Sequence, residues 1–133
     1  MGKIAKGMRA MNLSFDHIFS SPFLRTKQTA EIAAGILQPD HAIEYNEHLE
    51  PEGDREVFIG ELITKCGGED RVLVVGHEPY LSGLISFLAC GDDSLQIDFR
   101  KGGLCKLEIA SLRLGKCAVL EWLLTPKQLK DMR

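Results

Sequence analysis

Residues 20–31, SSPFLRTKQTAE, connect a predicted apolar strand to a predicted helix that runs to about Leu37. Ser21 suits the N-cap of this helix, and Pro22 suits its first position, where a missing N–H costs nothing. The free N–H groups at a helix N-terminus favour an anion. Arg25 adds a planar cation whose geometry matches two phosphate oxygens. This stretch therefore predicts an anion site at the end of a strand.

The rest of the chain alternates strands with helices. Strands are expected at residues 17–20, 42–45, 72–75, 104–109 and 117–124, with residues 95–99 extended, and helices at residues 3–11, 22–37, 55–65 and 81–88. Asp54 suits the N-cap of the third helix. The continuous apolar run Val72–Val75 is typical of a strand buried on both faces. The pattern predicts an α/β fold of three layers, with a mainly parallel or mixed sheet covered by helices on both faces.

Length and composition indicate a single domain spanning residues 1–133, with 44% hydrophobic and 26% charged residues. The net charge of -3 and the lack of a basic stripe argue against a nucleic-acid partner. No apolar run is long enough to cross a membrane and no signal peptide precedes the domain, so we expect a cytoplasmic protein. The four scattered cysteines form no CxxC or metal-ligand pair, which predicts free thiols, no metal and no cofactor.

Ligands of parallel α/β sheets bind beyond the carboxyl ends of the strands. Two polar segments fall at such ends: Ser20 to Arg25 after one strand, and His77 after another. Ser20 is therefore a candidate phosphate-binding residue, and Gln28, almost one turn beyond Arg25, is placed to brace the arginine or the serines. His77 is placed to donate a hydrogen bond to the same oxyanion.

The segments 16–31 (DHIFSSPFLRTKQTAE) and 74–79 (VVGHEP), and more weakly 99–104 (FRKGGL), resemble the histidine phosphatase superfamily, also called phosphoglycerate mutase-like. The closer match is to its small SixA-type phosphohistidine phosphatases, over essentially the whole chain. The resemblance implies a histidine nucleophile that forms a phosphohistidine intermediate, with Arg25 clamping the phosphate and His77 stabilising the transferred group. The implied substrate is a phosphorylated protein, such as a phosphotransfer domain of bacterial signalling, and no metal is needed.

The family places its nucleophile in an Arg-His-Gly motif on the first strand, and this chain has no such motif. We interpret His17 as a packed or partly exposed residue, and His41 and His48 as surface residues. Aligned by its motifs, the chain lacks about 25–30 residues expected of the family, including the central strand of the sheet. We therefore expect a longer natural polypeptide, and neighbouring strands with unpaired edges.

Three alternatives remain open at this stage. A sugar phosphate or other small phosphomonoester would need an acid for its alcohol leaving group, and Glu50 and Glu52 are the candidates. If the polypeptide starts at Met1, Arg25 and His77 would form only a phosphate- or partner-binding remnant. An unrelated nucleotide-binding domain is disfavoured because neither GxGxxG nor a P-loop motif occurs.

Overall fold

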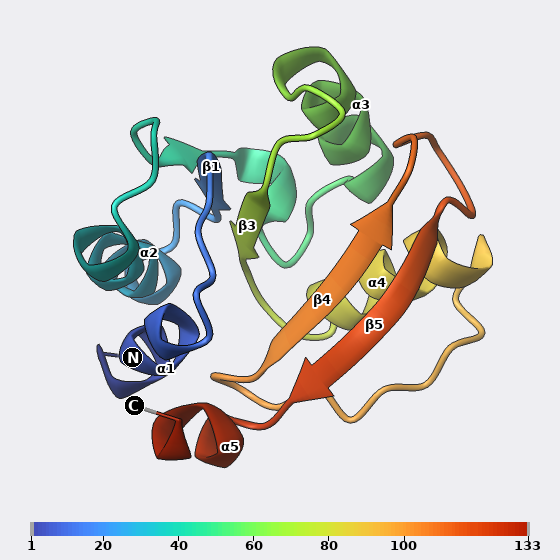
Figure 1. Cartoon of the computed structure of the whole chain (residues 1–133). Helices are drawn as coiled ribbons and strands as arrows, with labels where there is room; N and C mark the ends of the chain where they lie inside the picture. Colours follow the sequence, from blue (N-terminus) through green and yellow to red (C-terminus); the bar gives the residue numbers. More distant parts are fainter. Residues whose placement is uncertain (1, 133) are drawn as a thin grey trace.

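A computed structural model describes residues 2–132 of the chain (Figure 1). Its elements, in chain order, are α1 (Gly2–Ala10), β1 (His17–Ser20), α2 (Leu24–Leu37), β2 (Glu44–Tyr45), a 3₁₀ helix (Glu47–Leu49), α3 (Arg55–Lys65), β3 (Val72–Val75), α4 (Tyr80–Cys90), β4 (Leu104–Ile109), β5 (Ala118–Leu124) and α5 (Pro126–Asp131). The predicted alternation of strands and helices is confirmed.

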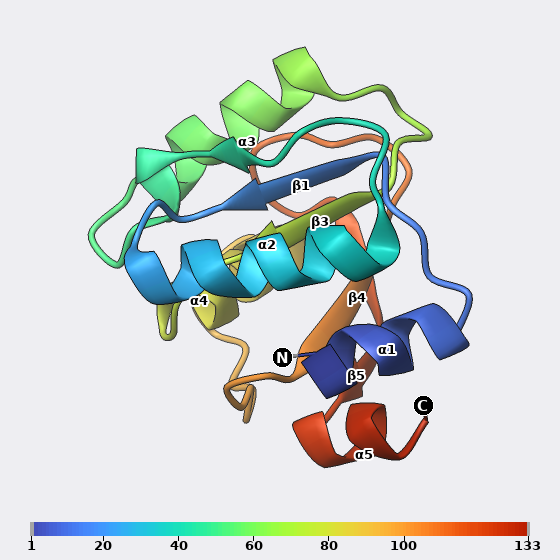
Figure 2. The same cartoon turned by 90° about the vertical axis from the view of Figure 1, so that its left-hand side faces the viewer.

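Helices cover both faces of the parallel strands, as predicted (Figures 1 and 2). On one face, Ile18 and Leu73 pack in a hydrophobic cluster with residues of α1 and α2. On the other face, Phe19 packs in a second cluster with residues of α3 and α4. Successive side chains of β1 thus point to opposite faces, as strand geometry requires. The result is a three-layer α/β fold.

The strands form two separate sheets. One has the order β2-β1-β3 and is parallel, and the other pairs β4 with β5 antiparallel. In the parallel sheet, β1 and β3 are aligned from His17 beside Val72 to Ser20 beside Val75. Within residues 2–132, β3 pairs only with β1, and β4 only with β5. The expected unpaired strand edges are therefore present.

Four local predictions need correction. Helix α2 begins at Leu24 and not at Pro22, because Ser21 N–H still donates to Val75 O and keeps the chain extended. Strand β2 is shorter than expected, since only two of its residues pair with β1. Residues 95–99 form no strand: the Ser86 hydroxyl accepts from Leu95 N–H and donates to Asp92 O. In β3 only Leu73 is buried, whereas Val72, Val74 and Val75 are half-buried, so the strand is packed on both faces but less deeply than expected.

The capping role of Asp54 is confirmed, because its carboxylate accepts hydrogen bonds from the N–H groups of Glu56 and Val57. We predict that Asp54→Ala lowers the free energy of unfolding by about 1 kcal/mol, since two donors at the start of α3 lose their acceptor. Urea denaturation measures this change. Glu69→Ala, which alters an exposed loop carboxylate, is the matched control and should leave the midpoint unchanged. Equal midpoints for Asp54→Ala and the wild type would contradict the capping role.

Candidate active site

The carboxyl ends of β1 and β3 bring His77 and Ser21 into contact. His77 Nε2 lies 2.8 Å from Ser21 Oγ. The side chain of His77 is half-buried, and the edge of its ring contacts Phe23 with a centroid separation of 5.1 Å. The register of β1 and β3 explains this contact, because Ser20 pairs with Val75 at the ends of the two strands. Ser21 directly follows Ser20, and His77 lies two positions after Val75. This is the polar junction predicted from the sequence.

Of the two serines, Ser21 and not Ser20 is the one that contacts His77. The hydroxyl of Ser20 is fully buried and donates to Ser21 O at 2.9 Å. Ser21 is also buried, but its hydroxyl points to His77 and accepts from Phe23 N–H. The sequence favoured Ser20 because it is the last residue of the strand. In the structure Ser21 N–H also donates to Val75 O, so the pairing with β3 continues for one more residue. The Ser20 hydroxyl is therefore not directed at His77, and a site role for Ser20 stays a prediction.

The N-terminus of α2 adjoins this junction and has no side-chain cap. Phe23 occupies the N-cap position with extended backbone angles, and no side chain accepts from the first turn. The Thr26 hydroxyl instead donates to two carbonyls, Ser21 O at 3.1 Å and Phe23 O at 2.8 Å. It fixes the segment before the helix without using the helical N–H groups. These groups remain available to an anion.

Arg25 and Gln28 both lie on the exposed side of α2 near its start. Within the described residues, Arg25 makes no hydrogen bond or ion pair, so its guanidinium is available to a ligand. Gln28 makes none either, and the bracing role expected of it is not formed in this structure. The two residues are three positions apart, which places them on one face of the helix.

The two candidate acids occupy the turn after the 3₁₀ helix. Glu50 is half-buried and Glu52 is exposed. A methyl group added at Gly76 would lie 3.8 Å from Leu49 O, so the backbone just before Glu50 runs beside the residue that precedes His77. Glu50 is therefore the better placed of the two, although neither carboxylate hydrogen-bonds another side chain within residues 2–132.

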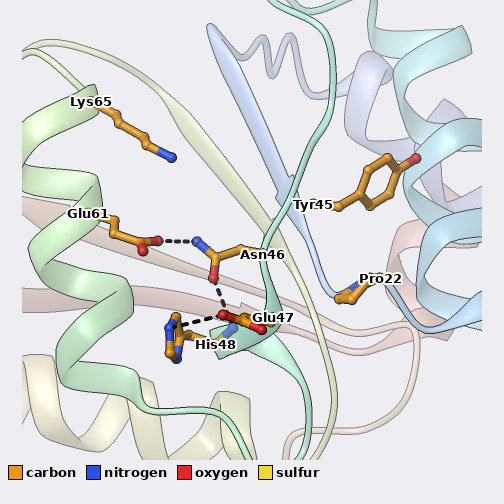
Figure 3. A pocket seen from close by; sticks show the side chains of 7 residues that line it. All are labelled: Pro22, Tyr45, Asn46, Glu47, His48, Glu61 and Lys65. Carbon is orange, nitrogen blue, oxygen red and sulfur yellow. Dashed lines mark hydrogen bonds and ion pairs between the residues drawn. The ribbon is translucent and has the colours of Figure 1, made fainter.

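A cavity of about 430 Å³ lies beside the site and reaches it only at Pro22. Its other lining residues are Tyr45, Asn46, Glu47, His48, Glu61 and Lys65 (Figure 3). Asn46 donates a short hydrogen bond to Glu61, and Lys65 pairs with Glu44 at 2.8 Å. Two carboxylates and one already paired lysine make this cavity a poor anion site. The junction of Ser21, His77 and the start of α2 is better suited to an anion, because it offers free helical N–H groups and no carboxylate.

No family model matches the chain. A protein of Picosynechococcus sp. described as uncharacterized is 28% identical over 112 residues, which span 84% of this chain and 67% of that protein. A solved structure titled as the protein histidine phosphatase SixA complexed with tungstate superimposes with a TM-score of 0.81. It is 22% identical, and the match covers 96% of this chain and 80% of the SixA chain.

The chain therefore has a SixA-like α/β fold, and the resemblance found in the sequence is confirmed at the level of the fold. The four cysteines, all within the described residues, are free thiols, as expected. No helix among residues 2–132 is long and apolar enough to span a membrane. The extension of the polypeptide before Met1 stays a prediction, as do the roles of the individual site residues.

We predict that Ser21→Ala shifts the ring ¹⁵N resonances of His77, because the imidazole loses its 2.8 Å partner. Heteronuclear NMR of the histidine rings measures the shift. Ser20→Ala is the matched control: it removes a neighbouring hydroxyl that bonds a backbone carbonyl, and it should leave the His77 ring signals in place. Ring signals that are insensitive to Ser21→Ala would show that the contact is not formed in solution.

Proposed function

We propose that this domain belongs to a phosphatase that hydrolyses phosphohistidine on a signalling protein. The observation that carries the proposal is the contact of His77 with Ser21 beside the uncapped start of α2, with the unpaired Arg25 on its first turn. The SixA-like fold supports it, because the same fold carries a protein histidine phosphatase. A cytoplasmic location and a phosphotransfer domain as partner are parts of the same proposal.

The chemistry needs positioning and charge neutralisation more than further reactive groups. A histidine nitrogen attacks the phosphorus, a new P–N bond forms, and the P–N bond to the substrate imidazole breaks. The departing imidazole takes up a proton and leaves as a neutral ring. Water then cleaves the enzyme's P–N bond, which releases phosphate and restores the histidine. Arg25, His77 and the N–H groups of α2 would stabilise the charge on the phosphoryl oxygens in both steps.

The nucleophile in this proposal comes from a strand that carries Arg-His-Gly and pairs with the free edge of β3. Arg71 O and Val75 O accept hydrogen bonds from the β1 side. Because successive carbonyls along a strand point to opposite edges, the backbone groups of Val72 and Val74 point away from β1. Within residues 2–132 they pair with no strand. A strand placed there would end beside His77, since parallel strands end at the same edge of a sheet.

A second candidate substrate is a small phosphomonoester, which the half-buried position of Glu50 favours. An alkoxide is a poor leaving group and needs a proton donor, whereas an imidazole leaves more readily. For a phosphomonoester substrate we assign the role of proton donor to Glu50. A phosphate-binding remnant without turnover is the third reading, and the experiments below distinguish it.

We predict that the domain extended by an Arg-His-Gly strand releases phosphate from a phosphohistidine-bearing protein, and that residues 1–133 alone do not. Arg25→Ala and His77→Ala should each lower the rate of the extended form about 100-fold or more, because each removes one stabilising donor. Phosphate release in a continuous assay measures the rate.

Arg9→Ala is the matched control for that assay, since Arg9 is an exposed arginine on α1. It should retain the wild-type rate. Binding of inorganic phosphate without turnover in either form would favour the remnant. Neither binding nor turnover in the extended form would overturn the proposed function.

We predict that Glu50→Gln leaves phosphohistidine hydrolysis within about threefold but lowers hydrolysis of an alkyl phosphomonoester about 100-fold, because only the second leaving group needs a strong proton donor. Parallel rate measurements on the two substrates test this. Glu52→Gln, which changes the exposed neighbour, is the control and should affect neither rate. Equal losses on both substrates would exclude Glu50 as a donor specific to the leaving group.

A further inference from the structure

His17, Cys66 and Asp70 come together at the opposite end of the parallel sheet. His17 begins β1, Cys66 directly follows α3, and Asp70 lies just before β3. His17 Nε2 is 3.0 Å from Asp70 Oδ2, and the ligand atoms of all three residues lie within 4.8 Å of one another. Figure 1 shows the loop that leads from α3 into β3 beside β1. His17 and Ser21 are four positions apart, roughly 13 Å along the strand.

The spacing of these atoms approaches that of a tetrahedral zinc site. Zinc bonds to imidazole nitrogen, thiolate sulfur and carboxylate oxygen measure about 2.0–2.3 Å, so neighbouring ligand atoms in a tetrahedron lie about 3.3–3.8 Å apart. The His17–Asp70 separation of 3.0 Å is slightly shorter than these values, and no separation among the three ligand atoms exceeds 4.8 Å. Small changes in the side-chain torsion angles would bring the three groups to bonding distances around one ion.

The backbone holds the three residues together independently of any ion. Asp16 and His17 donate their N–H groups to Arg71 O, at 2.8 and 3.2 Å. Asp70 Oδ2 accepts from Gly67 N–H at 2.7 Å, which closes the loop that carries Cys66. The strand pairing thus fixes His17 against Asp70, and the loop hydrogen bond fixes Cys66 against Asp70. A binding site that is formed before the ligand arrives loses little conformational entropy on binding.

The charges around the cluster favour a cation. Asp16 lies next to it and accepts from Arg71 N–H at 2.7 Å. The guanidinium of Arg71 is turned to Ser14 Oγ at 3.1 Å, and Lys65 is paired with Glu44. The nearby cations are therefore engaged with other groups. The His17 and Asp70 side chains are 16% and 33% exposed, so an ion can reach them from solvent.

His41 extends the cluster on its exposed side. Its ring stacks on that of His17, with centroids 4.4 Å apart and planes 5° from parallel. A water molecule would take the fourth position of a tetrahedral site.

We propose that His17, Cys66 and Asp70 bind a zinc ion that fastens the loop between α3 and β3 to the start of β1. A simple ion pair between His17 and Asp70 accounts for two of the residues but not for the thiol beside them. A thiolate with an imidazole selects zinc over magnesium or calcium, which prefer oxygen ligands. On binding, the thiol proton passes to solvent as the Zn–S bond forms. The pattern was missed in the sequence because the ligands are scattered over 54 positions from 17 to 70, with no paired spacing.

Cobalt(II) is a spectroscopic substitute for zinc that reports thiolate ligation directly. We expect the reduced, metal-free chain to bind one equivalent of cobalt, with the intense visible bands of a tetrahedral ion and a near-ultraviolet sulfur-to-cobalt band. Zinc should displace the cobalt. Cys66→Ser should abolish the near-ultraviolet band, and His17→Gln should weaken binding at least tenfold. Cys90→Ser, which alters the exposed thiol on α4, is the matched control and should retain the full spectrum.

A second measurement uses the unmodified chain and does not depend on how the variants fold. Zinc should slow alkylation of Cys66 at least tenfold, as read by peptide mass mapping, and leave the exposed Cys90 unchanged. Cys105, whose pKa is raised by burial to about 11, serves as a slow reference thiol. Equal labelling of Cys66 with and without zinc, or a cobalt complex without a thiolate band, would overturn the proposal.

Discussion

The parallel pairing of β1 with β3 determines where the functional groups of this chain lie. The register sets His17 beside Val72 and Ser20 beside Val75, so the residues at or just beyond each end of the pair lie close together. At the carboxyl end these are Ser21 and His77, 2.8 Å apart. At the amino end they are His17 and Asp70, 3.0 Å apart. One short run of backbone hydrogen bonds thus organises both polar clusters.

The two ends differ in charge. The carboxyl end combines the N–H groups at the start of α2 with Arg25 and His77, which favours an anion. The amino end combines carboxylates with an imidazole and a thiol, which favours a metal cation. The cavity beside Pro22 belongs to neither cluster: its Glu61 carboxylate accepts from Asn46, its Glu47 carboxylate lies 3.8 Å from His48, and its Lys65 pairs with Glu44. The proposed phosphatase chemistry and the proposed zinc site are therefore spatially separate.

Strong local signals made much of the fold predictable. The apolar runs at β1 and β3, the Asp54 cap and the strands β4 and β5 all follow from short stretches of sequence. The start of α2 was misplaced because Ser-Pro is a good helix opening, whereas pairing with β3 holds Ser21 extended. Propensity was overridden by a tertiary hydrogen bond at that point.

The candidate site was only partly predictable, for the same reason. His77 follows an apolar strand and Arg25 follows a helix start, so both positions could be inferred from local pattern. The roles of Ser20 and Ser21 could not be separated, because only the register decides which hydroxyl points to His77. The cluster of His17, Cys66 and Asp70 gave no signal in the sequence, since long-range pairing alone brings it together.

The division of the strands into two sheets is the feature that most constrains the account of function. The outer edge of β3 carries unpaired backbone groups, which a further strand would satisfy. We propose that the strand carrying the nucleophile pairs there, with its last residues beside His77. The proposed anion site does not depend on this strand, because Ser21, His77 and the start of α2 are all present in residues 2–132.

The most direct test of the central claim is therefore a crystal structure of this chain soaked with tungstate, an analogue of phosphate. The account predicts one ion at the carboxyl ends of β1 and β3, in contact with His77 Nε2, the first N–H groups of α2 and the Arg25 guanidinium. An ion bound only in the cavity beside Lys65, or no ion at this junction, would contradict it.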